Sequence, residues 1–185
     1  MTVNPVLLET LRSAQRFGFF GERVIEQAVE HSMEFVRGIA DVAAPARLLD
    51  LGSGGGLPGL VIADARPDID VLLLDRRQKR TDFLERAVIG LGWINVTVMC
   101  ADVSELSRLV LTSSVAKFDV VTARGFGPPE FTLRSAMRVL GAGGRILISE
   151  PPEGDRWPVD LLAELGVRGE RVGAVQVFRR LTDHG

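Results

Sequence analysis

The feature that most constrains the fold of this chain is a glycine-rich segment that directly follows an apolar run. The segment reads Leu48-Leu49-Asp50-Leu51-Gly52-Ser53-Gly54-Gly55-Gly56-Leu57-Pro58-Gly59. Glycine lets a backbone approach a ligand closely, and the free N–H groups at a helix start face the same place. An apolar strand, a glycine loop and a helix start in this order predict a strand-loop-helix unit whose loop contacts a ligand.

Short apolar runs alternate with amphipathic segments along the rest of the chain. Unbroken apolar runs suit parallel strands that are buried on both faces, and apolar residues at helical spacing mark helices. Their alternation predicts an α/β fold with a mostly parallel, doubly wound sheet. The expected strands are Leu48-Leu49, Val71 to Leu74, Val96 to Met99, Phe118 to Val121 and Ile146 to Ile148, with helices around Phe83 to Leu91, Leu106 to Val110 and Leu133 to Leu140.

Further elements are expected on both sides of this core. Helical spacing marks Val24 to Ile39 and, more weakly, Val6 to Arg16, and we expect these helices to cover the sheet or the site. The aromatic stretch Phe17 to Gly21 between them is interpreted as a hydrophobic plug on the core or as a lid over substrate. The chain end is expected to form a helix at Val159 to Leu165 and strands at Val167 to Val172 and Val175 to Phe178.

Length and composition favour one functional domain. With 185 residues, of which 46% are hydrophobic and 25% charged, the chain suits one compact core. We expect residues 1–185 to form a single domain, with 1–44 as an N-terminal helical cover and 45–185 as the core. A net charge of −2 neither indicates nor excludes binding to nucleic acid.

Four absences from the sequence favour a cytoplasmic protein without a metal or a membrane span. Cys100 is the only cysteine, so an intrachain disulfide is impossible, and no leader-like segment opens the sequence. No apolar run approaches the roughly 20 residues that span a bilayer. One cysteine and two histidines, His31 and His184, cannot supply four good zinc ligands without carboxylates, so we expect no metal.

An acidic residue after the second expected strand limits the classes of ligand that the glycine loop is expected to bind. Asp75 follows the loop glycines at close to the roughly 20-residue distance expected for an acid that binds ribose hydroxyls. Gly54 to Gly59 also satisfies G-x-G-x-x-G, the dinucleotide fingerprint, which alone is weak evidence. A nicotinamide dehydrogenase therefore stays open as an alternative at this point.

The wider set of motifs resembles the class I S-adenosylmethionine-dependent methyltransferases, which have a Rossmann-like fold. The resemblance rests on Asp50-x-Gly52-x-Gly54-x-Gly56, on Asp75, on Ala101-Asp102-Val103 and on a turn formed by Gly141, Gly143, Gly144 and Arg145. It implies S-adenosyl-L-methionine as the cofactor. The residues that it implies for cofactor binding are Asp50, Gly52, Ser53, Gly54, Gly56 and Leu57 at the methionine end, Asp75 and Arg76 at the ribose, Asp102, Val103 and Ser104 at the adenine, and Arg124.

Each of these residues also has a purely structural interpretation. Asp75 can be a plain strand-end acid, Asp102 a helix N-cap, and the glycines a tight turn. Arg124 can bind the cofactor or a substrate phosphate, or it can form a salt bridge to a loop acid. The set as a whole favours the cofactor site more strongly than any one member.

A narrower resemblance is to the bacterial small-subunit ribosomal RNA methyltransferase G family, also called glucose-inhibited division protein B. It rests on Gly54-x-Gly56-Leu57-Pro58-Gly59, on Leu72-Leu73-Leu74-Asp75 with Lys79-Arg80 and Phe83-Leu84, and on Phe118-Asp119 with Ala123-Arg124-Gly125-Phe126. The family methylates N7 of a guanosine in 16S ribosomal RNA, so the implied partner is 16S rRNA or the small ribosomal subunit. Two elements differ: an N-terminal motif rich in tryptophan, asparagine and threonine is absent, and Ser149-Glu150-Pro151 replaces a lysine-glycine.

Guanine N7 as the acceptor would remove the need for a general base. Its in-plane lone pair carries no proton, so positioning and the exclusion of water would carry catalysis, and no catalytic base is expected. Neither histidine lies beside a glycine loop or strand end, and His31 is interpreted as a packing or helix-surface residue. The basic run Arg76, Arg77, Lys79 and Arg80 is interpreted as a solvated helix face or as a contact for RNA phosphates.

The methyl acceptor stays open at the level of the sequence. A small-molecule methyltransferase and a non-catalytic cofactor-binding module of the same fold are alternatives to an rRNA methyltransferase, because fold alone does not fix function.

Overall fold

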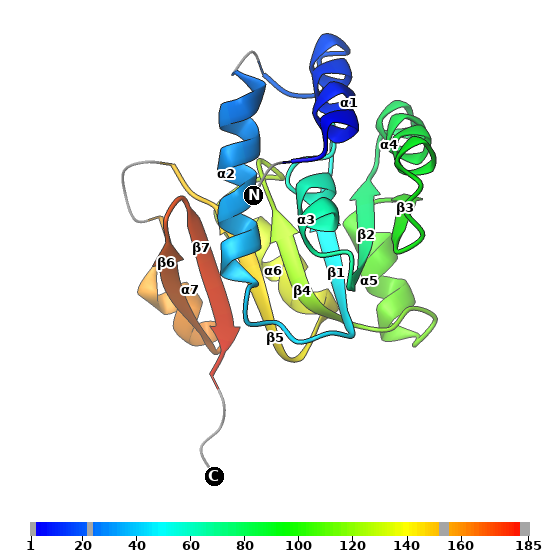
Figure 1. Ribbon diagram of the computed structural model, residues 1–185. Helices are drawn as coiled ribbons and strands as arrows, with labels where there is room; N and C mark the ends of the chain where they lie inside the picture. Colours follow the sequence, from blue (N-terminus) through cyan, green and yellow to red (C-terminus); the bar gives the residue numbers. More distant parts are fainter. Residues whose placement is uncertain (1–2, 22–23, 152–155, 182–185) are drawn as a thin grey trace.

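A computed structural model describes residues 3–21, 24–151 and 156–181, and its centre is a seven-stranded sheet (Figure 1). The strands are β1 (Ala46–Leu51), β2 (Ile69–Asp75), β3 (Val96–Cys100), β4 (Phe118–Ala123), β5 (Leu140–Ser149), β6 (Val167–Val172) and β7 (Val175–Arg180). Their order in the sheet is β3-β2-β1-β4-β5-β7-β6. Strands β1 to β5 pair in parallel, whereas β7 runs antiparallel to both β5 and β6. The predicted mostly parallel α/β sheet is confirmed.

The apolar runs form strands because the sheet is covered on both faces. In β1, Leu48 faces one hydrophobic cluster, Leu49 and Leu51 face the other, and all three are fully buried. A strand with this environment needs apolar residues at successive positions rather than at alternate ones.

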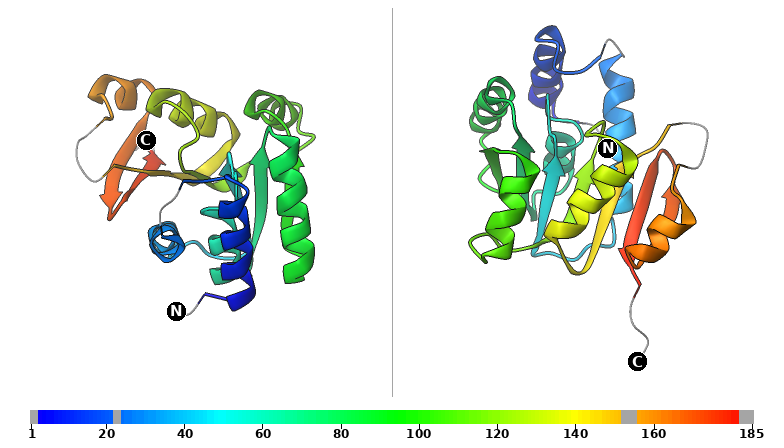
Figure 2. Two further views of the ribbon diagram at one scale, coloured as in Figure 1. Left: turned by 90° about the horizontal axis from the view of Figure 1, so that it is seen from above. Right: turned by 180° about the vertical axis from the view of Figure 1, so that it is seen from behind.

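Seven helices of the described residues divide between the two faces of the sheet (Figure 2). Buried residues of the first four pack into one cluster, and those of the fifth and sixth pack into the other. Buried residues of both N-terminal helices, which were expected to cover the sheet or the site, belong to the first of these clusters. The helices are α1 (Pro5–Arg16), α2 (Ile25–Gly38), α3 (Gly59–Ala65), α4 (Gln78–Leu91), α5 (Val103–Leu111), α6 (Pro129–Val139) and α7 (Val159–Glu164).

One boundary differs from the sequence-based expectation. Leu140 begins β5 instead of ending the preceding helix, and the glycines expected to form a turn into this strand lie within it. The pairing with β4 is irregular there, because Phe118 pairs with Leu140 whereas Val120 pairs with Arg145. The glycine-rich segment thus bulges out of the ladder before regular pairing resumes.

The order of the strands determines where a ligand site can form. From β1 the chain runs outward through β2 to β3 and then crosses back to place β4 on the other side of β1, so the direction of winding reverses at β1. Ligands of open α/β sheets bind outside the carboxyl ends of the strands at such a switch point. The glycine loop begins there. No helix of the described residues is both long enough and apolar enough to cross a membrane.

Candidate functional site

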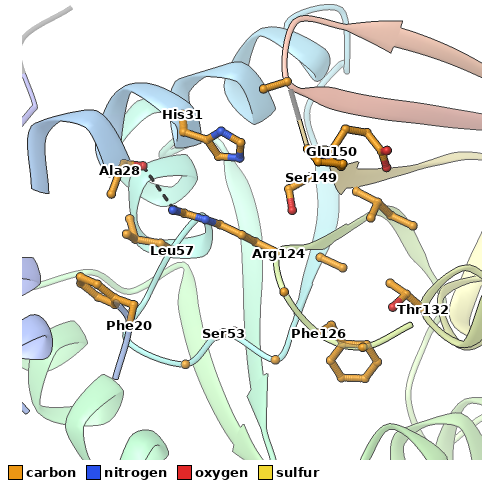
Figure 3. A pocket seen from close by; sticks show the side chains of 18 of the residues that line it. Phe20, Ala28, His31, Ser53, Leu57, Arg124, Phe126, Thr132, Ser149 and Glu150 are labelled. Carbon is orange, nitrogen blue, oxygen red and sulfur yellow. Dashed lines mark hydrogen bonds between the residues drawn. The ribbon is translucent and has the colours of Figure 1, made fainter. Parts of the chain in front are cut away.

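A cavity of about 890 Å³ opens at the carboxyl ends of β1, β4 and β5 (Figure 3). Ligand pockets of folded proteins commonly measure roughly 300–1,000 Å³, so this cavity can enclose a molecule of nucleoside size with a further group beside it. Segments from six parts of the chain line it. They are Phe19 to Gly21, α2 through Ala28 and His31, the glycine loop, α4 through Arg80, the β4–α6 loop with the start of α6, and the C-terminal part from the end of β5 through Arg156 and Arg171 to the β6–β7 turn.

The glycine loop has a conformation that other residues reach only with strain. Gly52 has φ +68° and Gly54 has φ +56°, both in the left-handed region. A Cβ on Gly55 would lie 2.5 Å from the ring of Phe20, so the loop also packs directly under the N-terminal aromatic segment. Five of the predicted site residues line the cavity: Gly52, Ser53, Gly54, Leu57 and Arg124.

Asp50 lies behind this loop rather than in the cavity wall. It is fully buried, Oδ2 accepts a hydrogen bond from the Gly59 N–H at 3.2 Å, and Oδ1 accepts one from Thr122 Oγ1 at 2.7 Å. The carboxylate therefore joins the first residue of α3 to β4. Burial raises the pKa of Asp50 to about 6, although both hydrogen bonds favour the ionised form.

Asp50→Asn is expected to weaken the pH dependence of stability. Because the folded pKa lies above the ordinary 3.8, the contribution of Asp50 is complete below pH 3.8 and is lost as the pH rises through about 6. Asparagine keeps a carbonyl oxygen for Gly59 and does not ionise. Relative to wild type, the variant should therefore gain up to about 3 kcal/mol of unfolding free energy between pH 4 and pH 7. Urea unfolding at both values measures this, and a constant difference between the two proteins would contradict it.

Asp75 ties the second strand to the same loop. Its Oδ2 accepts hydrogen bonds from the Gly54 N–H at 3.0 Å and from Arg80 Nη1 at 3.2 Å, and Oδ1 accepts one from the Arg77 N–H at 2.9 Å. The side chain is 4% exposed, and Arg80 rather than Asp75 lines the cavity. Asp75 is therefore more than a plain strand-end acid, because it positions the loop.

The predicted adenine contacts lie beyond the edge of the cavity. Asp102 is exposed and caps α5, since its Oδ1 accepts the Ser104 N–H at 2.9 Å. This hydrogen bond is the main reason that the pKa of Asp102 is lowered. The Ala101 N–H donates to the Asp75 carbonyl at 3.2 Å, so this segment begins beside Asp75. Of the predicted residues, Asp50, Gly56, Asp75, Arg76, Asp102, Val103 and Ser104 do not line the cavity.

Arg124 reaches from the β4–α6 loop across to α2. Its Nη1 lies 3.3 Å from both the Ala28 carbonyl oxygen and Ser32 Oγ, and Figure 3 shows the first of these contacts. The positive charge of Arg124 favours the ionised form of Asp50, and it therefore offsets part of the rise in pKa that burial causes. The predicted strand-end arginine thus joins the core of the sheet to the helix that closes one side of the cavity.

The basic run after β2 divides between two roles. Arg80 pairs with Asp75 at the cavity, whereas Arg76, Arg77 and Lys79 are exposed. Lys79 lies over the ring of Phe19 at 5.9 Å from its centroid. Three cations therefore remain on the surface next to the start of α4.

Several cavity residues were not predicted from the sequence. Glu150 is buried at the end of β5, where it accepts hydrogen bonds from Trp157 Nε1 at 3.0 Å and from Arg156. His31, interpreted as a packing residue, does contact the ring of Phe35, yet it also lines the cavity, as does Thr132. The Phe17 to Gly21 stretch, by contrast, could be singled out from the sequence, because its aromatic content is unusual for a loop.

Comparison with known proteins identifies the family. The family model described as rRNA small subunit methyltransferase G matches residues 11–150. A protein of that name from Laribacter hongkongensis is 40% identical over 103 residues, covering 56% of this chain and 47% of the relative. The one from Mycolicibacterium smegmatis is 32% identical over 160 residues, covering 86% and 65%. The chain thus spans from about half to two thirds of the length of these relatives.

The structural comparison supports the fold alone. A precorrin-6y C5,15-methyltransferase from Geobacter metallireducens superposes with a TM-score of 0.58 at 16% identity, covering 85% of this chain and 87% of that one. With this fold, with the glycine loop and Asp75 in their expected places, and with a family model matched from residue 11 to residue 150, the chain belongs to the rRNA small subunit methyltransferase G family.

Proposed function

We propose that this chain transfers a methyl group from S-adenosylmethionine to N7 of a guanosine in 16S rRNA. The observation that carries the proposal is the left-handed glycine loop fixed by the buried Asp75 at the switch point of the sheet, beside a cavity of about 890 Å³. The names of the curated relatives support the RNA acceptor.

The cofactor fits the residues at this edge of the sheet. Its methionine end would lie against Gly52 to Leu57, its ribose at Asp75 and its adenine near Asp102 and Val103. A carboxylate offers about four acceptor positions, and the protein already uses three at Asp75. One position is left for a first ribose hydroxyl, and we expect the second to displace Arg80 from Oδ2, since Arg80 is the only one of the three donors on a movable side chain.

The acceptor chemistry demands little from side chains. When bound, the cofactor supplies an electrophilic methyl on sulfur, the N7 lone pair forms the new bond, and the pair of the breaking S–C bond returns to sulfur. No proton leaves N7, so no base is required, and the purine takes up the positive charge. The protein contributes by aligning the two groups and excluding water, and the exposed Arg76, Arg77 and Lys79 would contact RNA phosphates.

Labelled S-adenosylmethionine tests the proposal. We expect label in RNA when the chain is incubated with small ribosomal subunits, or with their rRNA, from cells that lack this methylation. Label in a metabolite but not in RNA would favour the small-molecule alternative, and binding without transfer would favour a non-catalytic module. Thermal stabilisation by NAD but not by S-adenosylmethionine would contradict the cofactor itself.

A further inference from the structure

A buried hydroxyl in the acceptor half of the cavity has no hydrogen-bond partner. Thr132 is 2% exposed, and its Oγ1 is the one buried side-chain nitrogen or oxygen of residues 3–21, 24–151 and 156–181 without a partner. Leaving a buried hydroxyl unpaired costs free energy, commonly about 1–3 kcal/mol. Because the oxygen itself is inaccessible, a ligand in the cavity can supply the missing partner only when the threonine side chain rotates toward it.

The position of Thr132 relates this hydroxyl to the acceptor rather than to the cofactor. Thr132 lines the cavity from the first turns of α6, together with Phe126 of the preceding loop. In Figure 3 it lies on the same side as Phe126 and Ser149, with Phe20 and Leu57 across the cavity. The ring of Phe126 in turn lies 2.7 Å from where a Cβ on Gly52 would be. Phe126 thus stands between the glycine loop and Thr132.

The surroundings of Thr132 favour an electron-rich partner. Helix α6 has 11 residues, begins after Pro128 and has no side-chain cap, so the N–H groups of its first turn leave a partial positive charge there, which the exposed Glu130 offsets in part. Phe126 is half-buried, and one face of its ring stacks on Phe131 at 5.8 Å between centroids, so the opposite face is the one on which a flat base can stack. An aromatic face beside an unpaired hydroxyl at a positive helix end suits a base that presents a carbonyl oxygen.

We propose that Thr132 Oγ–H donates a hydrogen bond to O6 of the guanine whose N7 is methylated, and so selects guanine over adenine. The inference rests on the proposed function. On the Hoogsteen edge guanine presents the acceptors N7 and O6, whereas adenine presents N7 and an amino group that donates. Because N7 must face the methyl group, O6 is the atom left for the hydroxyl. An adenine amino group would meet the positive end of α6 instead of an electron-rich atom.

Thr132→Val separates a ligand-binding role from a structural one. Valine keeps the branched shape, and no protein hydrogen bond is lost, so stability should be unchanged or raised. Affinity for S-adenosylmethionine should also be unchanged, whereas kcat/KM for 16S rRNA should fall about tenfold, the size of one hydrogen bond to a buried group. Thr122→Val is the structural contrast, because it removes the donor to Asp50 and should lower stability. Thr97→Val removes an exposed hydroxyl on β3 and should change neither the stability nor kcat/KM for 16S rRNA.

An acceptor without O6 completes the test. RNA that carries 2-aminopurine in place of the methylated guanine, at a position mapped beforehand, lacks O6. Beyond the intrinsic difference between the two bases, wild type should methylate this RNA about tenfold more slowly than guanine RNA. Thr132→Val should show only the intrinsic difference. Equal losses in both proteins, undiminished transfer by Thr132→Val, or a clear loss of its stability would overturn the inference. If wild type methylates guanine and Thr132→Val does so equally well, only this inference fails; if wild type methylates no RNA, the proposed function fails with it.

Discussion

Asp75→Ala is expected to lower the affinity for S-adenosylmethionine by at least about 100-fold. The carboxylate would accept hydrogen bonds from the ribose hydroxyls, and bonds to a charged group contribute about 1.5–3 kcal/mol each. Two such bonds correspond to a factor of about 100 or more in the dissociation constant. The change also releases the Gly54 N–H and leaves Arg80 without its carboxylate partner, so the glycine loop itself loses its tie to β2.

Isothermal titration calorimetry measures this effect against a matched control. Asp70 is an exposed acid on the same strand, and Asp70→Ala should bind the cofactor as wild type does. Circular dichroism should show that both variants remain folded. Wild-type affinity in folded Asp75→Ala would mean that the ribose is not held at this acid, and the placement of the cofactor would then be wrong.

Gly59→Ala is expected to cause a large loss of stability. Its Cβ would lie 2.4 Å from Leu73 Cδ2 and 2.6 Å from Asp50 Oδ2, and both side chains are fully buried. Overpacking a rigid core usually costs about 1–3 kcal/mol and occasionally more. Displacing Asp50 would also strain its hydrogen bonds to the Gly59 N–H and to Thr122, so we expect the upper end of this range, a fall in melting temperature of roughly 10 °C.

Gly90→Ala supplies a control of opposite sign. Gly90 is exposed within α4, and a Cβ there would meet no atom within 4 Å. Gly90 is the second-last residue of α4, so the roughly 0.5–1 kcal/mol by which alanine is favoured over glycine in a helix interior is an upper bound here, and this variant should melt at or slightly above the wild-type temperature. Thermal unfolding followed by circular dichroism compares the two. Equal melting temperatures for Gly59→Ala and wild type would show that α3 shifts freely away from β1.

The sheet was predictable because its information is local. Apolar runs such as Val71 to Leu74 and Phe118 to Val121 need both faces covered, and this requirement alone indicates parallel strands. The glycine loop was predictable for the same reason, because its residues are contiguous in the sequence and Asp75 follows at the end of the next strand. The start of β5 was misjudged because Leu140 continues the spacing of α6, while pairing with Phe118 places it in the sheet.

The contacts that close the cavity opposite the glycine loop were not predictable from the local sequence pattern. Arg124 meets Ala28 across 96 positions of the chain, and Glu150 and Thr132 meet the cavity from a strand end and a helix start. No spacing rule relates such residues, since only the packing of α2 and α6 onto the sheet brings them together. Asp102 shows that a local pattern can also fit two roles at once, because an acid directly before a helix is both a good N-cap and a plausible adenine partner.

The most direct test of the account is the chemical identity of the product base. We predict that 16S rRNA from cells that lack this methylation, incubated with the chain and S-adenosylmethionine and then digested to nucleosides, yields 7-methylguanosine by mass spectrometry. With S-adenosylmethionine near the wild-type dissociation constant, the Asp75→Ala variant should yield far less 7-methylguanosine, while Asp70→Ala should match wild type. A methyl group on any other atom, or an RNA that stays unmodified while wild type binds the cofactor, would contradict the account.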